Sequence, residues 1–210
     1  MVHLNGFTVK IIPQRGDQDK IQKHGSNYVG LENGAEYNLF LGNDRNTEAM
    51  AEVHVEGENI GTFFIPANQN IIIERPADSS RKFVFVSERD YRASQAGVIS
   101  GEFTNGLVRV IFYPKKQKVY SPRVMRSSSP RLAMQSSRSS MSYGGGATIL
   151  GDKSYQTFGT KSRFEDSEID WNNKTEITIR LVVKQEYIIS KPYVSISNRN
   201  NYQTSIPPRI

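Results

Sequence analysis

Residues 51–86 read AEVHVEGENIGTFFIPANQNIIIERPADSSRKFVFV, and this stretch decides the fold class. Val53 and Val55 alternate with polar residues, a Glu-Gly pair breaks the run, and Phe63 and Ile65 alternate again before a proline. Such alternation is typical of half-buried β-strands, because successive side chains point to opposite faces of a sheet. Three or four short strands with their turns fill the stretch and leave no room for a helix. The sequence therefore predicts an all-β protein.

Similar runs recur along the chain with turn residues between them. Ile71 to Ile73 predict a buried strand that closes at Arg75-Pro76, and Phe83 and Phe85 alternate in the strand that follows. Short strands with turn signals roughly every ten residues are typical of sandwiches and barrels. We expect strands near residues 6–12, 27–31, 36–41, 50–56, 60–65, 70–75, 81–86, 107–113, 147–150, 175–183 and 192–197.

Local turn and helix signals agree with this assignment. Asn5-Gly6, Asn33-Gly34 and Asn105-Gly106 each stand just before an apolar run, where Asn and Gly supply the positive φ angles of tight turns. One stretch has helical features, Ser87 to Ala96, which opens with Ser and Glu and ends before Gly97. We expect a short helical crossover there, on the surface and outside the core.

Composition bounds the class further. The chain has 210 residues, 37% of them hydrophobic, which suits a single domain over 1–210. It contains no Cys, which excludes disulfides, thiolate nucleophiles and iron–sulfur clusters. There is no signal-peptide pattern and no run near the ~20 apolar residues of a membrane helix, so we expect synthesis as a soluble protein in the cytoplasm. Pro207-Pro208 predicts an extended C-terminal tail over 198–210.

The positive charge is concentrated in one segment. The formal net charge is +6, and residues 115–142 hold seven basic residues and no acidic one, so the rest of the chain carries −1. Residues 121–142 include nine Ser, four Arg and two Pro. This composition predicts a flexible, basic, Ser/Arg-rich low-complexity insertion over 115–146. Its function is either that of an arm that binds an acidic partner or nucleic acid, or that of a solvated linker.

Residues with catalytic chemistry do not form a recognisable set. His3, His24 and His54 lie in separate segments without metal-ligand spacing, and His54 is expected on the strand face opposite its neighbouring valines. Residues 146–154, GATILGDKS, lack the long helix that a phosphate-binding loop requires, so we expect a strand over 147–150 and a turn at Gly151-Asp152. We therefore expect no catalytic or cofactor-binding residues and no small-molecule substrate.

The acidic and aromatic residues leave binding functions open. Glu165, Asp166, Glu168 and Asp170 offer oxygen ligands for Ca²⁺, but a solvated loop is the simpler interpretation, and we expect no metal site. Five aromatic residues fit the core: Phe40, Phe63, Phe83, Phe85 and Phe112. Others suit either a sugar-binding face or a subunit interface, and periodicity does not separate these functions: Tyr28, Tyr37, Tyr91, Tyr113, Tyr120, Trp171 and Tyr193.

Several motifs resemble one protein family. Residues 55–86, VEGENIGTFFIPANQNIIIERPADSSRKFVFV, are followed in order by NGLVRVIFYP at 105–114, GATILGDKSYQTFGT at 146–160 and ITIRLVV at 177–183. This succession is similar to the penton, or vertex capsid, proteins of large icosahedral double-stranded DNA viruses. The resemblance covers most of residues 36–183.

The resemblance implies a single jelly-roll β-sandwich that assembles as a homopentamer in the virion and contacts major and minor capsid proteins. In this interpretation Gly57 and Gly61 form turns, Pro76 and Pro114 end strands, and three residues form a polar cluster beside a buried strand: Glu74, Arg75 and Arg81. The segment 115–142 would contact inner-capsid proteins, DNA or a membrane. The alternatives are a carbohydrate-binding β-sandwich, as in an attachment module or a lectin, and a minor capsid or cement protein of the same fold. No enzyme is expected.

Overall fold

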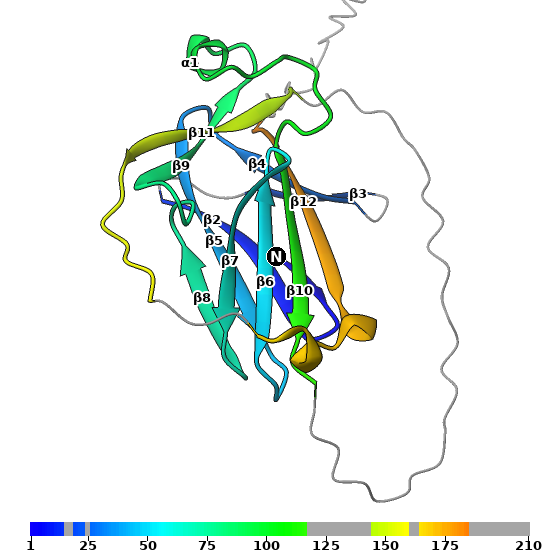
Figure 1. Ribbon diagram of the computed structural model, residues 1–210. Helices are drawn as coiled ribbons and strands as arrows, with labels where there is room; N and C mark the ends of the chain where they lie inside the picture. Colours follow the sequence, from blue (N-terminus) through cyan, green and yellow to red (C-terminus); the bar gives the residue numbers. More distant parts are fainter. Residues whose placement is uncertain (15–18, 24–25, 117–143, 160–163, 185–210) are drawn as a thin grey trace, which may run out of the picture.

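The structure is a computed structural model, and it describes residues 1–14, 19–23, 26–116, 144–159 and 164–184. Two β-sheets pack against each other, and short helical segments lie at opposite ends of the molecule (Figure 1). Over these residues the protein is a β-sandwich, which confirms the predicted all-β class.

Sheet A has six strands in the order β1-β2-β5-β9-β11, with β8 also paired to β5. All of its neighbouring strands are antiparallel. The long strand β5 pairs with β9 through its first residues and with β8 through its last. The strands are β1 (Val2–Leu4), β2 (Phe7–Pro13), β5 (Ala35–Asn43), β8 (Gln69–Ile73), β9 (Arg81–Ser87) and β11 (Gly146–Lys153).

Sheet B also has six strands, in the order β3-β4-β12-β10-β6-β7. The β4–β12 pair is parallel, and the other neighbours are antiparallel. The chain passes repeatedly between the sheets, since the β6–β7 hairpin belongs to sheet B and the next two strands belong to sheet A. The strands are β3 (Asp19–Lys23), β4 (Ser26–Leu31), β6 (Ala49–Val55), β7 (Glu58–Ile65), β10 (Leu107–Pro114) and β12 (Thr175–Val183).

The interior between the sheets is apolar. Alternate residues of the central strands are buried there, such as Val53 in β6 and Val110 in β10. Phe7 of sheet A stacks on Phe112 of sheet B with ring centroids 4.4 Å apart, so this pair joins the sheets directly. Each large apolar side chain that is fully buried contributes roughly 1.5–3 kcal/mol. The interior is therefore the main source of stability.

The outer face of sheet A is more apolar than the sequence indicated. Ile73 is buried as predicted, but Ile72 is 45% exposed, so the prediction of a buried strand was wrong at this residue. The reason is that β8 pairs with β5 alone among the described strands and turns alternate side chains outward. Phe40, which was assigned to the core, is opposite Ile72 on this outer face, with its ring against Gly42.

Two glycines that were predicted to form turns lie instead inside irregular strands. The predicted turn at Gly151-Asp152 was wrong, because β11 continues to Lys153 through a register shift against β9. A Cβ at Gly151 would clash with Val84, so only glycine fits there. Gly61 likewise lies inside β7 beside a register shift, with a φ of 139° that favours glycine. The strands β1 and β3 were missed, and the predicted strand at 192–197 lies outside the described residues.

The three Asn-Gly turns use their asparagines in two ways. Within these three turns the glycine always has a positive φ, whereas the asparagine has a positive φ in the Asn5-Gly6 turn alone. Asn33 instead accepts a hydrogen bond from the amide of Ser87 at 2.8 Å, and Asn105 donates one to Glu88 at 2.9 Å. These two asparagines therefore fasten loops through their side chains.

The helix α1 (Tyr91–Gln95) is shorter than the predicted 87–96. It begins after Asp90, whose carboxylate accepts a hydrogen bond from the amide of Arg92 at 2.9 Å. Ala93 packs on the outward side chains of Val84 and Val86, so α1 covers one end of the outer face of sheet A. Two 3-10 turns lie at the opposite end of the molecule, η1 (Asp166–Glu168) and η2 (Trp171–Asn173).

Candidate functional site

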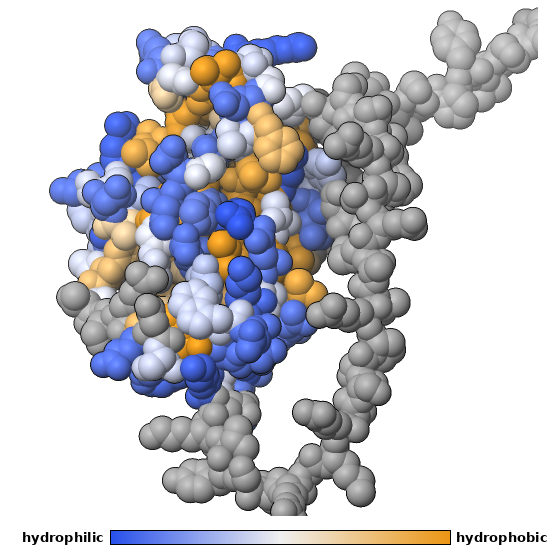
Figure 2. Space-filling model, turned by 45° about the vertical axis from the view of Figure 1, so that its right-hand side comes forward, coloured by the Kyte–Doolittle hydropathy of each residue, from blue (hydrophilic) through white to orange (hydrophobic). Residues whose placement is uncertain are grey.

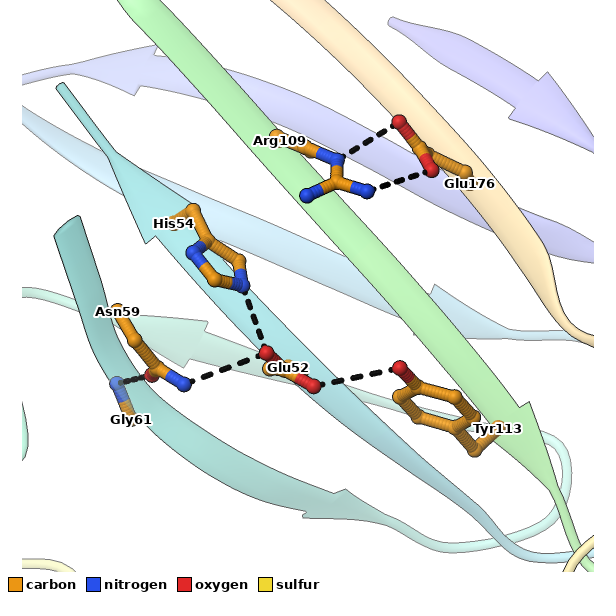
Figure 3. Close-up of polar contacts among 7 residues, drawn as sticks. All are labelled: Glu52, His54, Asn59, Gly61, Arg109, Tyr113 and Glu176. Carbon is orange, nitrogen blue, oxygen red and sulfur yellow. Dashed lines mark hydrogen bonds and ion pairs between the residues drawn. The ribbon is translucent and has the colours of Figure 1, made fainter. Parts of the chain in front are cut away.

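The outer face of sheet B carries a hydrogen-bonded polar network (Figure 3). Glu52 of β6 lies at its centre. One carboxylate oxygen accepts hydrogen bonds from His54 Nε2 at 2.7 Å and Asn59 Nδ2 at 3.3 Å, and the other accepts one from the Tyr113 hydroxyl at 3.3 Å. The side chains of Glu52 and His54 are 28% and 18% exposed, so solvent reaches a largely ordered network. His54 faces away from the core, as predicted.

An ion pair lies beside this network. Arg109 donates through Nε and Nη2 to the two oxygens of Glu176, at 2.7 and 2.9 Å. These hydrogen bonds lower the pKa of Glu176 and raise the pKa of Arg109. Arg109 is opposite His54 in the β6–β10 register. Glu176 thus balances the positive charge of the Arg109 guanidinium, and this ion pair lies next to the carboxylate of Glu52.

Aromatic residues border the network where β10 ends. The rings of Tyr113 and Trp171 lie 5.3 Å apart, edge to face, and Trp171 is 47% exposed. The segment that carries Trp171 is anchored on sheet B by a small second core, in which Phe164 and Ile169 pack on Met50. An exposed indole is therefore held in place beside the polar network.

Glu168 of the acidic cluster forms an ion pair with a lysine that follows β10. Lys115 Nζ lies 3.0 Å from Glu168 and 3.5 Å from Glu48, and Lys116 donates to the carbonyl of Ser167 at 2.8 Å. These two lysines, which were assigned to the basic insertion, are bound to the body of the sandwich. Residues 117–143 lie outside the described ranges. Within those ranges no group of three or more His, Asp or Glu is arranged to hold a metal ion.

Glu56 links the two sheets at the end of the sandwich that carries α1. It lies in the β6–β7 turn with a φ of 55°, an unfavourable value for a residue with a long side chain. Its carboxylate accepts hydrogen bonds from the amides of Thr148 at 2.7 Å and Gly106 at 2.9 Å. Thr148 belongs to sheet A, whereas Gly106 leads into β10 of sheet B. Burial raises the pKa of Glu56 to about 7, against the opposing effect of these hydrogen bonds and of Arg180.

Tyr37 supports this junction from inside. The sequence placed it among the aromatic residues of a binding face, and this was wrong, because it is fully buried. Its hydroxyl lies 2.8 Å from Thr148 Oγ1, and burial raises its pKa. The period of two within β5 explains the position, since Tyr37 shares the inner face with Leu39 and Leu41.

The other aromatic candidates do not form one surface. Tyr28 is half-buried in β4, Tyr91 is exposed on α1, and only Tyr113 and Trp171 among the described candidates are in contact. Two further candidates lie outside the described residues, Tyr120 and Tyr193.

Glu74, Arg75 and Arg81 all bind the segment that ends β11 and follows it. Arg75 donates to the carbonyl of Gln156 at 2.9 and 3.1 Å, and Glu74 accepts from the hydroxyl of Ser154 at 2.9 Å. Arg81 donates to the carbonyl of residue 151 at 2.7 Å. These contacts join β9 to the last residues of β11, and the residues that follow β8 to the chain beyond β11.

A groove of about 760 Å³ runs between α1 and β11 on the outer side of sheet A. Its lining includes two acidic and two basic side chains, those of Glu36, Asp152, Arg81 and Arg92. Arg92 also binds Asp90 at 2.8 Å, and the hydrogen bonds from Arg92 lower the pKa of Asp90. The lining charges balance, so the groove selects no sign of charge.

Apolar side chains are exposed around α1, at the upper end of the view in Figure 2. We call Tyr91, Ile99 and Phe103, which are 68–77% exposed, the apical patch. The loop that carries the last two is well held, because Glu88 accepts three hydrogen bonds from it at 2.8–2.9 Å. Arg180 donates to the Phe103 carbonyl at 2.9 Å and lies 5.0 Å from its ring.

A second apolar surface lies on the outer face of sheet A. Phe40, which is half-buried, and Ile72, which is 45% exposed, are cross-strand neighbours there. On the adjacent strand β2, Lys10 is opposite Phe40 and the half-buried Ile12 is opposite Asn38, two residues further along. We call Phe40, Ile72 and Ile12 the lateral patch. The apical patch lies around α1, which packs on β9 where β9 pairs with the first residues of β5, whereas Phe40 and Ile72 lie where the last residues of β5 pair with β8, so the two patches are at different ends of this face.

Neither the role of Glu56 nor the network around Glu52 was predicted from the sequence. Glu56-Gly57 has the position of a two-residue hairpin turn, which was the one available signal. The partners of Glu56 lie 50 and 92 residues away, and Tyr113 lies 61 residues from Glu52. Contacts at such separations depend on strand pairing across the whole fold.

Comparisons with protein-family models, curated proteins and solved structures give no match to this chain. Within the described ranges, no helix has the length and apolar character needed to cross a membrane.

Proposed function

We propose that this protein is a structural capsid protein that forms the pentameric vertex of a large icosahedral double-stranded DNA virus. The β-sandwich supports a single jelly-roll body, because jelly rolls are double-sheet folds of this kind. The motifs at 55–86, 105–114, 146–160 and 177–183, which resemble those of penton proteins, support the vertex role. The protein acts through its shape and its self-association, and not through catalysis.

The observation that carries this proposal is the presence of two separate apolar patches on one chain. A closed ring of identical subunits uses heterologous contacts, in which two different surfaces of each subunit meet. Exposed apolar side chains that are gathered in patches mark such contacts. The apical patch of one subunit contacts the lateral patch of the next, and five such contacts close the ring.

The basic segment 115–142 provides contacts with further partners. Lys115 and Lys116 bind the body, so five basic residues remain for this role: Lys118, Arg123, Arg126, Arg131 and Arg138. A ring of five chains brings five such segments together and attracts acidic inner-capsid proteins, DNA or an anionic membrane. Major and minor capsid proteins are the neighbours of the ring in the virion.

Light scattering of the purified protein tests the ring, with an expected mass five times the 23.7 kDa of one chain. Phe103→Asp in the apical patch and Ile72→Asp in the lateral patch each give monomers with unchanged thermal unfolding. Tyr155→Asp is the matched control and stays pentameric, because Tyr155 is 88% exposed outside both patches. A wild-type monomer that joins particles only with other capsid proteins would instead indicate a minor capsid or cement protein.

A mixing experiment tests whether the two patches meet. The Phe103→Asp chain keeps its lateral patch, and the Ile72→Asp chain keeps its apical patch. Mixed in equal amounts, they form one intact contact per pair and give heterodimers, but no ring. A mixture that stays monomeric would contradict the pairing of these two patches.

Deletion of residues 121–142 tests the basic segment. The shortened protein is expected to fold and to form pentamers, while its incorporation into particles falls. Unchanged assembly would contradict a role for the segment and favour a solvated linker.

A further inference from the structure

We propose that the outer face of sheet B binds a neutral pyranose sugar, at a site formed by Glu52, Asn59, Tyr113 and Trp171. This site is separate from both apolar patches. Its occupation therefore does not depend on the ring proposed above, and its failure would leave the ring untouched.

The aromatic side of the site suits the apolar face of a sugar ring. A pyranose presents C–H groups on one face, and aromatic rings offer a flat, polarisable surface for them. Trp171 is 47% exposed and lies 5.3 Å from the ring of Tyr113. The packing of Phe164 and Ile169 on Met50 holds the Trp171 segment on sheet B, so little ordering is needed on binding.

The polar side of the site suits neighbouring sugar hydroxyls. One carboxylate oxygen of Glu52 already accepts hydrogen bonds from His54 and Asn59, whereas the other accepts one from Tyr113 and keeps a second lone pair for a sugar hydroxyl. Two hydrogen bonds fix the orientation of the Asn59 side-chain amide: Nδ2 donates to Glu52, and Oδ1 accepts from the backbone amide of Gly61 at 2.8 Å. The donors and acceptors are thus arranged before the ligand arrives, which lowers the cost of binding.

The charges of the face favour a neutral sugar over an acidic one. The nearby guanidinium of Arg109 is engaged by both oxygens of Glu176. The carboxylate of Glu52, which accepts a hydrogen bond from His54 at 2.7 Å, would repel the carboxylate of a sialic acid or a sulfate group.

Fluorescence provides a direct test, because Trp171 is the single tryptophan of the chain. The full-length protein is titrated with maltotriose, chitotriose and methyl mannoside, with sialyllactose as the acidic comparison, up to roughly 10 mM to cover weak binding. We expect a saturable change with at least one neutral probe and none with sialyllactose, and calorimetry should give the same dissociation constant. No saturable signal from any neutral probe, or a preference for sialyllactose, would overturn the proposal.

Two substitutions locate the site. Glu52→Gln is expected to raise the dissociation constant at least about tenfold, and Tyr113→Phe about threefold, since each removes part of the hydrogen-bonding set. Glu32→Gln, an exposed carboxylate in the β4–β5 turn, leaves it unchanged. Thermal unfolding verifies that all variants are folded. Binding that survives both substitutions at Glu52 and Tyr113 would place the ligand elsewhere and overturn the assignment.

Discussion

The two sheets of this sandwich share one interior, but their outer faces differ. The outer face of sheet A carries apolar side chains such as Phe40 and Ile72 and is covered at one end by α1. The outer face of sheet B carries the network of Glu52 and the Arg109–Glu176 pair. The inner faces have the same character because they exclude water together. The outer faces are independent of each other, so the proposed ring contact can use the apolar face and the proposed sugar site the polar one.

The largest effect is expected for the shared interior. Phe112→Ala removes a fully buried ring that stacks on Phe7 across the sheets. The free energy of unfolding should fall by about 3–5 kcal/mol, from lost transfer energy and the cavity that remains. Urea denaturation measures this change. A loss below that of a substitution on an outer face would contradict the central place of the interior.

The junction between the sheets should respond to pH. The pKa of Glu56 is raised from 4.5 to about 7 in the folded protein, so between these values the folded state binds more protons than the unfolded state. The free energy of unfolding therefore falls as pH rises through this window, by up to about 3 kcal/mol, and levels off above it.

Glu56→Gln should remove this fall, because the amide does not ionise. Urea denaturation at several values between about pH 5 and about pH 8 compares the two proteins. Equal slopes would show that the carboxylate of Glu56 does not govern the pH dependence. Glu32→Gln serves as the control, since its carboxylate is exposed.

A smaller effect is expected on the outer face of sheet A. Phe40→Ala removes a half-buried ring that lies against Gly42, so the free energy of unfolding should fall by only about 1 kcal/mol. The same substitution weakens the proposed ring contact, which light scattering detects. A loss as large as that of Phe112→Ala would show that this face is part of the core.

The smallest effect is expected on the outer face of sheet B. Arg109 and Glu176 are 41% and 49% exposed, so their coupling in a double-mutant cycle with Ala should be about 0.2–1 kcal/mol. Added salt should reduce it further. A coupling that resists salt would indicate that the pair is less exposed to solvent than the structure implies.

Local patterns predicted the strands well where apolar and polar residues alternate and turn residues mark both ends of the strand. Val53 and Val55 point inward and His54 outward, as alternation requires. The prediction failed where the environment of a strand decides exposure: Phe40 and Ile72 are as hydrophobic as core residues, yet they lie on an outer face. The prediction for Tyr37 was wrong in the opposite direction. Its side chain is buried because a hydrogen bond with the Thr148 hydroxyl satisfies its own hydroxyl group inside the protein.

The candidate site was less predictable than the fold. Tyr113 and Trp171 were recognised as candidates, but nothing near them in the chain indicates that they meet or that Glu52 joins them. Their contacts require β6, β10 and the segment before β12 to lie side by side in sheet B.

The sequence by itself determined the all-β class, the approximate position of most strands and which side chains of one strand share a face, because a period of two is a local property of an extended chain. The tertiary structure decided which strands are neighbours and which outer face is polar. It also decided that the Glu56 carboxylate links the two sheets through its hydrogen bonds. Those features depend on contacts between residues as far as 92 positions apart in the sequence, and such contacts form only when the whole sandwich has folded.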